Sequence, residues 1–338
     1  MRHIHIPIFV PHLGCPHACV FCNQRTITGH NAFSLENAKA TIEAVLTTAP
    51  KDAHKEIAFF GGSFTAIDRE LMLTLLHLGK SYIEQGLVSS IRLSTRPDAI
   101  DDEILALLKA YGVETIELGI QSTDPAVLDL TERGHSVKDA KNACKLVKAY
   151  GFTLVGQMML GLPASTLDKE LKTAEDMTLW GIDEARIYPT VVFPDTALAA
   201  MMQEGSYTPL SIEEAAERGG ILLDYFDKHQ IPVIRVGLCE SEGLRHEERL
   251  AGAYHPALGE LCQSAFFRRR IEEQLTTLSL PAHAEITVEV SASSLSQAIG
   301  QKKSNLTYFE KTYPDHTFFF KPSFALGKKD VKIHTKEN

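Results

Sequence analysis

Three cysteines near the start of the chain constrain it more than any other feature. Cys15, Cys19 and Cys22 lie in the run Leu-Gly-Cys-Pro-His-Ala-Cys-Val-Phe-Cys-Asn, with the spacing C-x3-C-x2-C and no fourth cysteine nearby. A [4Fe–4S] cluster is normally held by four cysteine thiolates. Three thiolates can hold three irons and leave the fourth iron open to a substrate or cofactor, so the spacing predicts a reactive cluster rather than a simple electron store.

Two other uses of these cysteines stay open. Zinc also binds C-x2-C pairs, and a structural zinc site takes four ligands, of which His12 or His17 could be the fourth. A disulfide fits poorly, because nothing marks the chain as secreted. The apolar stretch at residues 6–10 is short and contains a proline, unlike the apolar core of a signal peptide.

Composition limits the class of protein. The 338 residues are 44% hydrophobic, enough for one large α/β domain and a small one. The sequence contains no run of about 18 apolar residues, so no membrane span is predicted. Six cysteines suit a reducing cytoplasm, where we expect the protein to be located.

Charge is spread unevenly along the chain. The formal net charge of −9 argues against a chain coated in positive charge for nucleic acid. Residues 301–338, however, contain eight lysines against four acidic residues, a net charge of +4, which leaves −13 for the first 300 residues. This basic end either contacts an anionic partner or only keeps the chain soluble.

Apolar and β-branched runs alternate with helical patterns over the first two thirds of the chain. The predicted strands cover residues 4–10, 56–60, 90–95, 115–121, 153–160 and 185–192. The predicted helices cover residues 37–46, 69–85, 101–111, 126–131, 137–150, 166–180 and 212–229. Six successive strand–helix units imply a parallel sheet.

Six units are too few for a closed eight-stranded barrel, so the prediction is a partial, open (β/α)6 TIM-like barrel. Residues 233–238 are a candidate for one more strand. After a stretch of ordered loop with helix at 240–280, a strand at 285–290, a helix at 295–312 and a strand at 317–321 predict a small α/β module. We therefore expect a barrel over residues 1–240 and a C-terminal extension over 241–338, with the module at about 284–322.

Distinctive residues follow the first two predicted strands. Ligands gather at the carboxyl ends of parallel strands, and the cysteine loop follows the first strand. Gly61, Gly62 and Ser63 follow the second. Two glycines allow the backbone to approach a ligand closely, and we expect their amides to be available as hydrogen-bond donors.

The third predicted strand ends in an arginine that suits an anionic ligand. Ser94 and Arg96 share one face of the strand. An arginine can bind a carboxylate through two parallel hydrogen bonds, so both residues are predicted to line a cofactor pocket. The alternative is an ion pair of Arg96 with Asp98 or Asp101 at the surface.

The fourth predicted strand carries polar residues where a buried strand would be apolar. Glu117, Gly119 and Gln121 share one face, and buried polar groups require partners. Glu117 is predicted either to act in catalysis or to make a structural hydrogen bond.

Three more polar residues are candidates near the later strands. Arg133 suits a carboxylate of a cofactor or substrate, and His135 is either a proton donor or a packing residue. Tyr188, on the sixth strand, is predicted to hold substrate or relay a hydrogen atom, with a simple buried hydrogen bond as the alternative.

The cysteine spacing resembles the signature of the radical S-adenosylmethionine (SAM) enzymes. That resemblance implies that the open iron binds the amino and carboxylate groups of SAM, and that Phe21 flanks the adenine. It further implies that Gly61 and Gly62 hold the SAM amino group, that Gln121 contacts the ribose, and that the strand containing Met159 surrounds the adenine.

The segment from about residue 5 to 235 looks closest to the radical SAM half of the Elongator catalytic subunit. The matching pieces are Ser-Thr-Arg-Pro-Asp, Glu-Leu-Gly-Ile-Gln-Ser, Arg-Gly-His, Met-Met-Leu-Gly-Leu-Pro and Arg-Ile-Tyr-Pro-Thr. The resemblance implies modification of transfer RNA. We expect this chain to lack the acetyltransferase domain of that family, and its first cysteine gap is shorter. A more distant resemblance is to the oxygen-independent coproporphyrinogen oxidases.

A lysine pair in the C-terminal module bears on the substrate. The run Leu-Ser-Gln-Ala-Ile-Gly-Gln-Lys-Lys-Ser-Asn-Leu at 295–306 resembles a degenerate KH loop, whose G-x-x-G clamps backbone nucleotides. Lys303 occupies the second glycine position, and Lys302 precedes it. Lysines there attract phosphate, so this loop is predicted to contact RNA; the alternative is an ordinary exposed helix start.

These observations lead to three hypotheses. In the preferred one, the chain is a radical SAM enzyme with a [4Fe–4S] cluster that cleaves SAM to a 5′-deoxyadenosyl radical for tRNA or other RNA modification. A reductase, flavodoxin or ferredoxin would supply the electron. In the second, the same chemistry acts on a small anionic metabolite, as in a coproporphyrinogen oxidase. In the third, the chain is a non-catalytic zinc- and RNA-binding protein.

Overall fold

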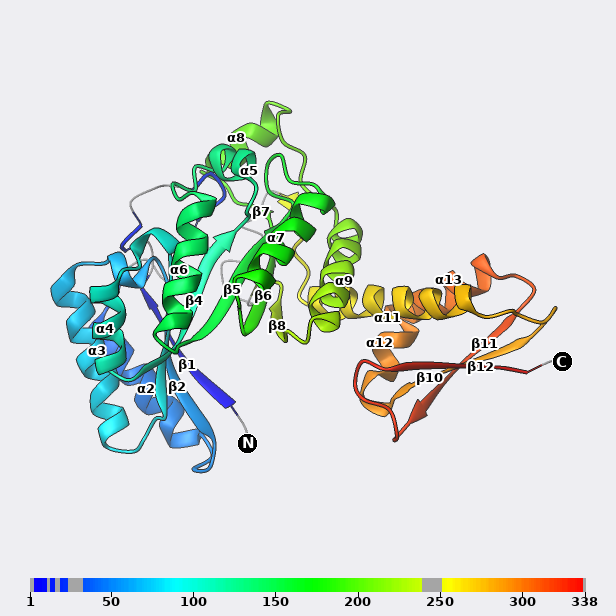
Figure 1. Cartoon of the computed structure of the whole chain (residues 1–338), viewed down its shortest axis with the longest axis horizontal. Helices are drawn as coiled ribbons and strands as arrows, with labels where there is room; N and C mark the ends of the chain where they lie inside the picture. Colours follow the sequence, from blue (N-terminus) through cyan, green and yellow to red (C-terminus); the bar gives the residue numbers. More distant parts are fainter. Residues whose placement is uncertain (1–2, 11–12, 16–18, 24–32, 239–250, 337–338) are drawn as a thin grey trace.

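A seven-stranded parallel sheet forms the larger part of the protein in the computed structural model (Figure 1). The model describes residues 3–10, 13–15, 19–23, 33–238 and 251–336. The strands are β1 (His3–Val10), β2 (His54–Gly61), β3 (Ser90–Thr95), β4 (Val113–Gln121), β5 (Thr153–Leu160), β6 (Glu184–Pro189) and β8 (Val233–Val236). They are ordered β1-β2-β3-β4-β5-β6-β8 and pair only in parallel. The predicted partial barrel is confirmed, and the candidate strand at 233–238 is its seventh strand.

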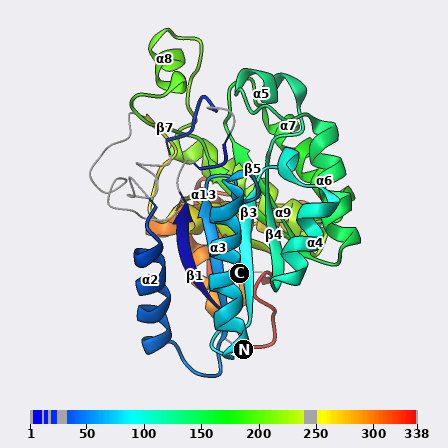
Figure 2. The ribbon, with the colours of Figure 1, turned by 90° about the vertical axis from the view of Figure 1, so that its left-hand side faces the viewer.

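Helices pack on one face of this sheet, against the apolar residues at every second strand position (Figure 2). Ile6, Ile57, Ile91 and Ile116 are fully buried in that layer. The helices of this layer are α2 (Leu35–Thr48), α3 (Arg69–Glu84), α4 (Asp102–Ala110), α6 (Val137–Ala149), α7 (Leu167–Leu179) and α9 (Ile212–Lys228), with short 3₁₀ turns η1 (Phe64–Ala66) and η2 (Pro97–Ala99). This part of the chain also contains α5 (Pro125–Leu130) and α8 (Ala197–Gln203), and α8 packs in a separate small apolar cluster. Because the apolar positions alternate, the opposite sheet face is left for polar side chains.

The predicted strand at 185–192 is two strands rather than one. β6 ends at Pro189, and β7 (Val191–Val192) leaves the main sheet to pair antiparallel with β9 (Ala251–Gly252). Between them, the Thr190 amide and hydroxyl both donate to the Leu160 carbonyl, at 2.9 and 2.7 Å. Proline has no N–H for a strand ladder, and Thr190 is held by β5, so the chain turns away there.

The C-terminal part is a second sheet supported by one long helix. It contains α11 (Leu258–Thr277), β10 (Glu285–Ser291), η3 (Ala292–Ser294), α12 (Leu295–Ile299), η4 (Gln301–Lys303), α13 (Ser304–Thr312), β11 (Thr317–Ser323) and β12 (Val331–Lys336). The strand order is β11-β10-β12, with β11 parallel and β12 antiparallel to β10. Its apolar core continues through α11 to α9, so the two sheets are joined by packing. We did not predict β12, in which Val331 and Ile333 alternate with Lys332 and His334.

The predicted helix over 295–312 is interrupted. Gly300 has a φ of +83°, and Lys302 and Lys303 have φ values of +53° and +64°. Two consecutive lysines in the left-handed region cannot continue a right-handed helix. The run therefore forms two short helices joined by a tight loop that carries the lysine pair.

No helix in the described ranges is long and apolar enough to cross a membrane.

Candidate functional site

The cysteine loop is fixed at the carboxyl end of β1 by the loop that follows β2. The Gly62 amide donates to the Val10 carbonyl at 2.9 Å, and the Ser63 amide donates to the Leu13 carbonyl at 3.0 Å. The Gly62 amide, which we expected to be available to a ligand, is instead used to position the loop that begins at Val10, and the Ser63 amide has the same role.

Three glycines permit this close approach of two loops. A Cβ added to Gly62 would lie 1.9 Å from the Leu13 carbonyl oxygen, and one on Gly14 would lie 2.2 Å from the Ser63 carbonyl oxygen. Gly61 has a φ of +108°, and its Cβ would lie 2.9 Å from the Val10 oxygen. Gly14 was not singled out from the sequence, although a glycine directly before the first cysteine is a visible signal.

We predict that Gly62→Ala displaces the cysteine loop. The added methyl group would overlap Leu13, a backbone contact that cannot rotate away, so the chain should incorporate less than about a tenth of the normal iron, as expected when a positioning group is lost. Iron and sulfide content after anaerobic reconstitution measures this. Gly259→Ala is the control, because its Cβ would lie 3.5 Å from the nearest atom. Equal iron content in both variants would contradict the prediction.

Arg133 lies beside the cysteine thiols. Its Nη1 donates to the Cys19 Sγ at 3.4 Å, and its Nη2 donates to the Gly119 carbonyl at 2.7 Å. A Cβ on Gly119 would lie 2.7 Å from that Nη2, which explains the glycine in this polar strand. Burial raises the pKa of the Cys15 thiol, and the charge of Arg133 opposes part of the rise. A guanidinium at this position stabilises thiolates, the form in which cysteine binds metal.

Cys22, the third cysteine, lies in a turn with Cys19. The Cys22 amide donates to the Cys19 carbonyl at 3.0 Å, which closes a turn. His12 and His17, the candidate fourth zinc ligands, lie outside the described residues.

Buried polar atoms without a protein partner gather around Arg133. Within the described residues these atoms are Arg96 Nη1, Gln121 Oε1 and Arg133 Nε. Arg96 donates to Asp98 at 2.9 and 3.0 Å and to the Arg133 carbonyl at 2.6 Å. The alternative of an Arg96–Asp98 ion pair is thus correct, but the arginine is 2% exposed rather than at the surface. Leaving several buried donors and an acceptor unpaired is costly, so these residues fit a polar, anionic ligand beside Cys19.

His135 is neutral in this setting. Burial and the positive charge of Arg133 lower the pKa of its imidazole to about 3. An imidazolium at this position would be unfavourable near neutral pH, so proton donation by the charged form of His135 is not supported.

A line of ionisable residues crosses the inner face of the main sheet. Glu56 Oε2 lies 3.1 Å from the His5 Nε2 and 3.2 Å from the Arg92 Nη2. Glu117 Oε1 then accepts from the Arg92 Nη1 at 3.0 Å and from the Arg186 Nη2 at 2.9 Å. We call His5, Glu56, Arg92, Glu117 and Arg186 the charge ladder.

The charge ladder holds the predicted catalytic residues in fixed positions. The second oxygen of Glu117 accepts from the Gln157 Nε2 at 2.7 Å and from the Ser94 hydroxyl at 3.4 Å. The Arg186 Nη1 donates to the Tyr188 hydroxyl at 3.4 Å. Ser94 therefore lies with the ladder rather than with Arg96.

Burial opposes ionisation of Glu56, but the hydrogen bond from His5 and the charge of Arg92 outweigh burial and lower the pKa of this carboxyl to about 2. Glu56, Arg92 and Gln157 were not singled out from the sequence. A signal was present for two of them: Glu56 directly precedes Ile57 and Arg92 directly follows Ile91, so each lies on the strand face opposite a buried isoleucine.

The other candidates lie at the edges of this region. Ser63 is fully buried, 2.9 Å from the Thr95 hydroxyl, and accepts from the Arg96 amide, so it joins two loops. Phe21 is half-buried against the small apolar cluster that contains Val192 and Leu198. Met159 is half-buried and pairs with Tyr188 across β5 and β6.

Comparison with known proteins agrees with this arrangement. A model of the radical SAM superfamily matches residues 9–177, half of the chain, and a model of the radical SAM C-terminal domain matches residues 182–268. A tRNA uridine(34) acetyltransferase of Methanocaldococcus infernus is 32% identical over 128 residues, which cover 37% of this chain and 24% of that protein. The heme chaperone HemW of Bacillus subtilis is 25% identical over 255 residues, 73% of this chain and 65% of HemW.

Among solved structures, the archaeal Elp3 of Methanocaldococcus infernus superposes with a TM-score of 0.61 at 20% identity, over 80% of this chain and 63% of that one. This likeness shows the fold. The chain spans less than two thirds of the length of each of these relatives.

Proposed function

Because the chain belongs to the radical SAM superfamily and resembles its Elp3-like members, we propose that it cleaves SAM reductively in order to modify RNA, with transfer RNA as the substrate. The match to this superfamily supports an enzyme whose cofactors are a [4Fe–4S] cluster and SAM, so the hypothesis of a non-catalytic zinc protein is set aside. When bound, these cofactors supply the electron and the 5′-deoxyadenosyl radical that removes a hydrogen atom from the substrate.

The single observation that carries the proposal is the position of Arg133 between the cysteine loop and unpaired polar groups. Cys15, Cys19 and Cys22 would hold the cluster, and the Cys19 Sγ already accepts from Arg133. Arg96 and Arg133 each keep one unpaired donor nitrogen, and Gln121 keeps an unpaired acceptor. These groups would bind the carboxylate and ribose of SAM beside Cys19.

The other proposed roles follow from position. Phe21 would flank the adenine from its apolar cluster, and Met159 would pack near it. The loop at Gly61, Gly62 and Ser63 would hold the cysteine loop in position. It would face SAM with backbone carbonyl groups rather than with free amides. The charge ladder would fix the floor of the pocket, with Glu117 and Tyr188 as the candidates nearest to substrate.

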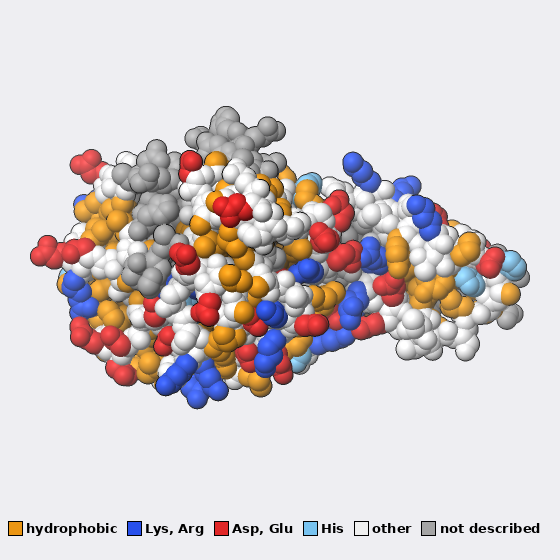
Figure 3. Space-filling model, turned by 90° about the horizontal axis from the view of Figure 1, so that it is seen from above, with side chains coloured by type: hydrophobic (Ala, Val, Ile, Leu, Met, Phe, Trp, Pro, Cys, Tyr) orange, Lys and Arg blue, Asp and Glu red, His pale blue; other side chains and the backbone are white. Residues whose placement is uncertain are grey.

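The proposed division of the chain assigns residues 1–240 to the barrel and residues 241–338 to an extension that contributes RNA contacts. In the extension, the loop between α12 and α13 presents Lys302 and Lys303, both exposed. Lysine and arginine side chains project from this narrow part of the molecule (Figure 3). A turn between two helices with adjacent cations suits a phosphate backbone, and the relatedness to a tRNA-modifying protein favours RNA as the partner.

The activity is tested by anaerobic reconstitution. We expect 5′-deoxyadenosine to form from SAM with dithionite, and its yield to rise when transfer RNA is added. Comparison of modified nucleosides in transfer RNA from strains with and without the protein identifies the product. SAM cleavage without any change in those nucleosides would instead favour the small-metabolite hypothesis, which the similarity to HemW keeps in consideration.

We predict that the double change Lys302→Glu, Lys303→Glu weakens transfer RNA binding on the order of tenfold and lowers the slope of log K against log salt by about 2, one for each lost phosphate contact. Filter binding over a range of salt concentrations measures both values. The double change Lys141→Glu, Lys145→Glu alters charge equally on exposed positions of α6 and serves as the control. If both pairs weaken binding equally, only net charge matters and the loop has no special role.

A further inference from the structure

Four potential metal ligands share one face of β1 and β2, at the end of the sheet opposite the cysteine loop. His3 and His5 are two residues apart on β1, and His54 and Glu56 are two residues apart on β2. The strands pair in parallel with His3 opposite His54 and His5 opposite Glu56. Residues two apart on a strand, and residues opposite each other in register, point to the same side, so the four form a two-by-two grid.

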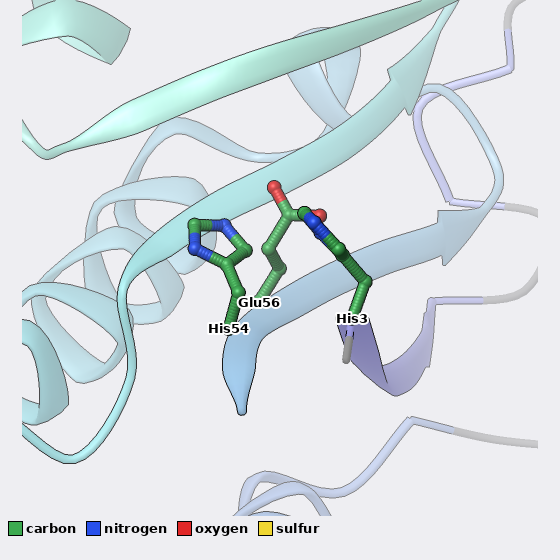
Figure 4. A group of neighbouring side chains, drawn as sticks. All are labelled: His3, His54 and Glu56. Atoms are coloured by element: carbon green, nitrogen blue, oxygen red, sulfur yellow. The ribbon is translucent and has the colours of Figure 1, made fainter. Parts of the chain in front are cut away.

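Three members of this grid have their ligand atoms close together. One ligand atom each of His3, His54 and Glu56 lies within 4.8 Å of the others. Figure 4 shows the two imidazole rings on either side of the Glu56 carboxylate, and the ring centroids are 4.8 Å apart. Zinc bonds of about 2.0–2.2 Å bring tetrahedral ligand atoms to roughly 3.4 Å from each other. Small rotations of the two histidine side chains would bring the ligand atoms from within 4.8 Å of one another to the roughly 3.4 Å that zinc requires.

The carboxylate in this group is held in place by its own partners. Glu56 is 3% exposed, its Oε1 accepts from the Ser90 hydroxyl at 3.1 Å, and Arg92 bonds its Oε2. Outer partners of this kind orient metal ligands. His3 is exposed and His54 is half-buried, so a cation can enter from solvent.

The donor set points to a class of metal. The charge of Arg92 offsets that of Glu56, and two of the three ligands of the site are imidazoles. Imidazole favours zinc, copper or nickel, whereas magnesium and calcium require mostly oxygen ligands. We propose that His3, His54 and Glu56 bind a divalent transition metal, with zinc as the best match, at a site separate from the cysteine loop. Water or His5 would take the fourth position.

The test uses zinc and the full-length, untagged chain in which Cys15, Cys19 and Cys22 are changed to serine, so that no thiolate loop competes. Competition with a chromophoric zinc chelator measures stoichiometry and affinity. We expect one zinc per chain, bound at least tenfold more weakly after His3→Ala, His54→Ala. The control is the double change His77→Ala, His229→Ala, which removes two exposed histidines elsewhere and should leave the affinity within twofold.

A second readout covers the case in which a variant folds less well. Zinc should raise the thermal unfolding midpoint of the parent chain and of the control, but not that of the His3→Ala, His54→Ala chain. Less than one zinc bound by the parent, or equal affinity in all three proteins, would overturn the proposal. Neither outcome depends on SAM cleavage, so this test is independent of the proposed enzymatic function.

Discussion

Replacing Cys19 with alanine is expected to abolish dithionite-dependent formation of 5′-deoxyadenosine. Cys19 is 8% exposed and its thiol accepts a hydrogen bond from Arg133, so it lies where the loop meets the unpaired polar groups. A cluster held by only two thiolates of this loop loses a ligand outright. Because loss of an outer-shell partner alone costs about 10–100-fold in metal affinity or activity, we expect at least about a 100-fold loss here.

The measurements are the yield of 5′-deoxyadenosine, the iron and sulfide content, and the absorption of the cluster, all under anaerobic conditions. Cys144→Ala is the matched control. Cys144 is fully buried in α6, where burial raises the pKa of its thiol to about 12, so it is a core residue and its removal should leave iron content unchanged. Normal SAM cleavage by the Cys19→Ala chain would refute the cluster assignment.

Glu117→Gln is expected to destabilise the fold by about 3 kcal/mol, the size typical of breaking a buried ion pair from one side. Glu117 is fully buried and accepts from Arg92, Arg186 and Gln157 at 2.7–3.0 Å. A neutral amide in its place leaves two buried guanidinium groups with less compensation, and one of its polar atoms becomes a donor facing other donors.

The midpoint of urea unfolding, followed by circular dichroism, measures this loss. Glu114→Gln is the control, because Glu114 is an exposed residue of the same strand and should change the free energy of unfolding by less than about 0.5 kcal/mol. The pair of variants also decides between the two roles predicted for Glu117. If SAM cleavage falls while stability is unchanged, Glu117 acts in catalysis and the charge ladder is not what holds it.

The larger elements of the fold were predictable because they depend on local patterns. The alternating apolar residues of β1 to β4 and the amphipathic helices between them specify strand–helix units, and such units form parallel sheets. The seventh strand was harder to predict: β8 is four residues long and only partly buried, so its pattern is weak. The break at Gly300 was missed because the flanking residues favour helix, whereas the left-handed conformation of the next two lysines depends on how α12 and α13 pack.

The residues of the candidate site also fall into those predictable from short segments of sequence and those brought together only by the fold. The sequence by itself determined the three thiols, their spacing and the glycine-rich loop after β2, because each depends on residues a few positions apart. Only the tertiary structure decided that Arg133 reaches Cys19, that Arg96 donates to the Arg133 carbonyl, and that His5 and Arg186 end one charge ladder across the sheet. Those partners are separated by up to 114 positions in the chain. Which side chains meet across a sheet is set by strand order and register, and these come from burial of the whole apolar face rather than from any short segment.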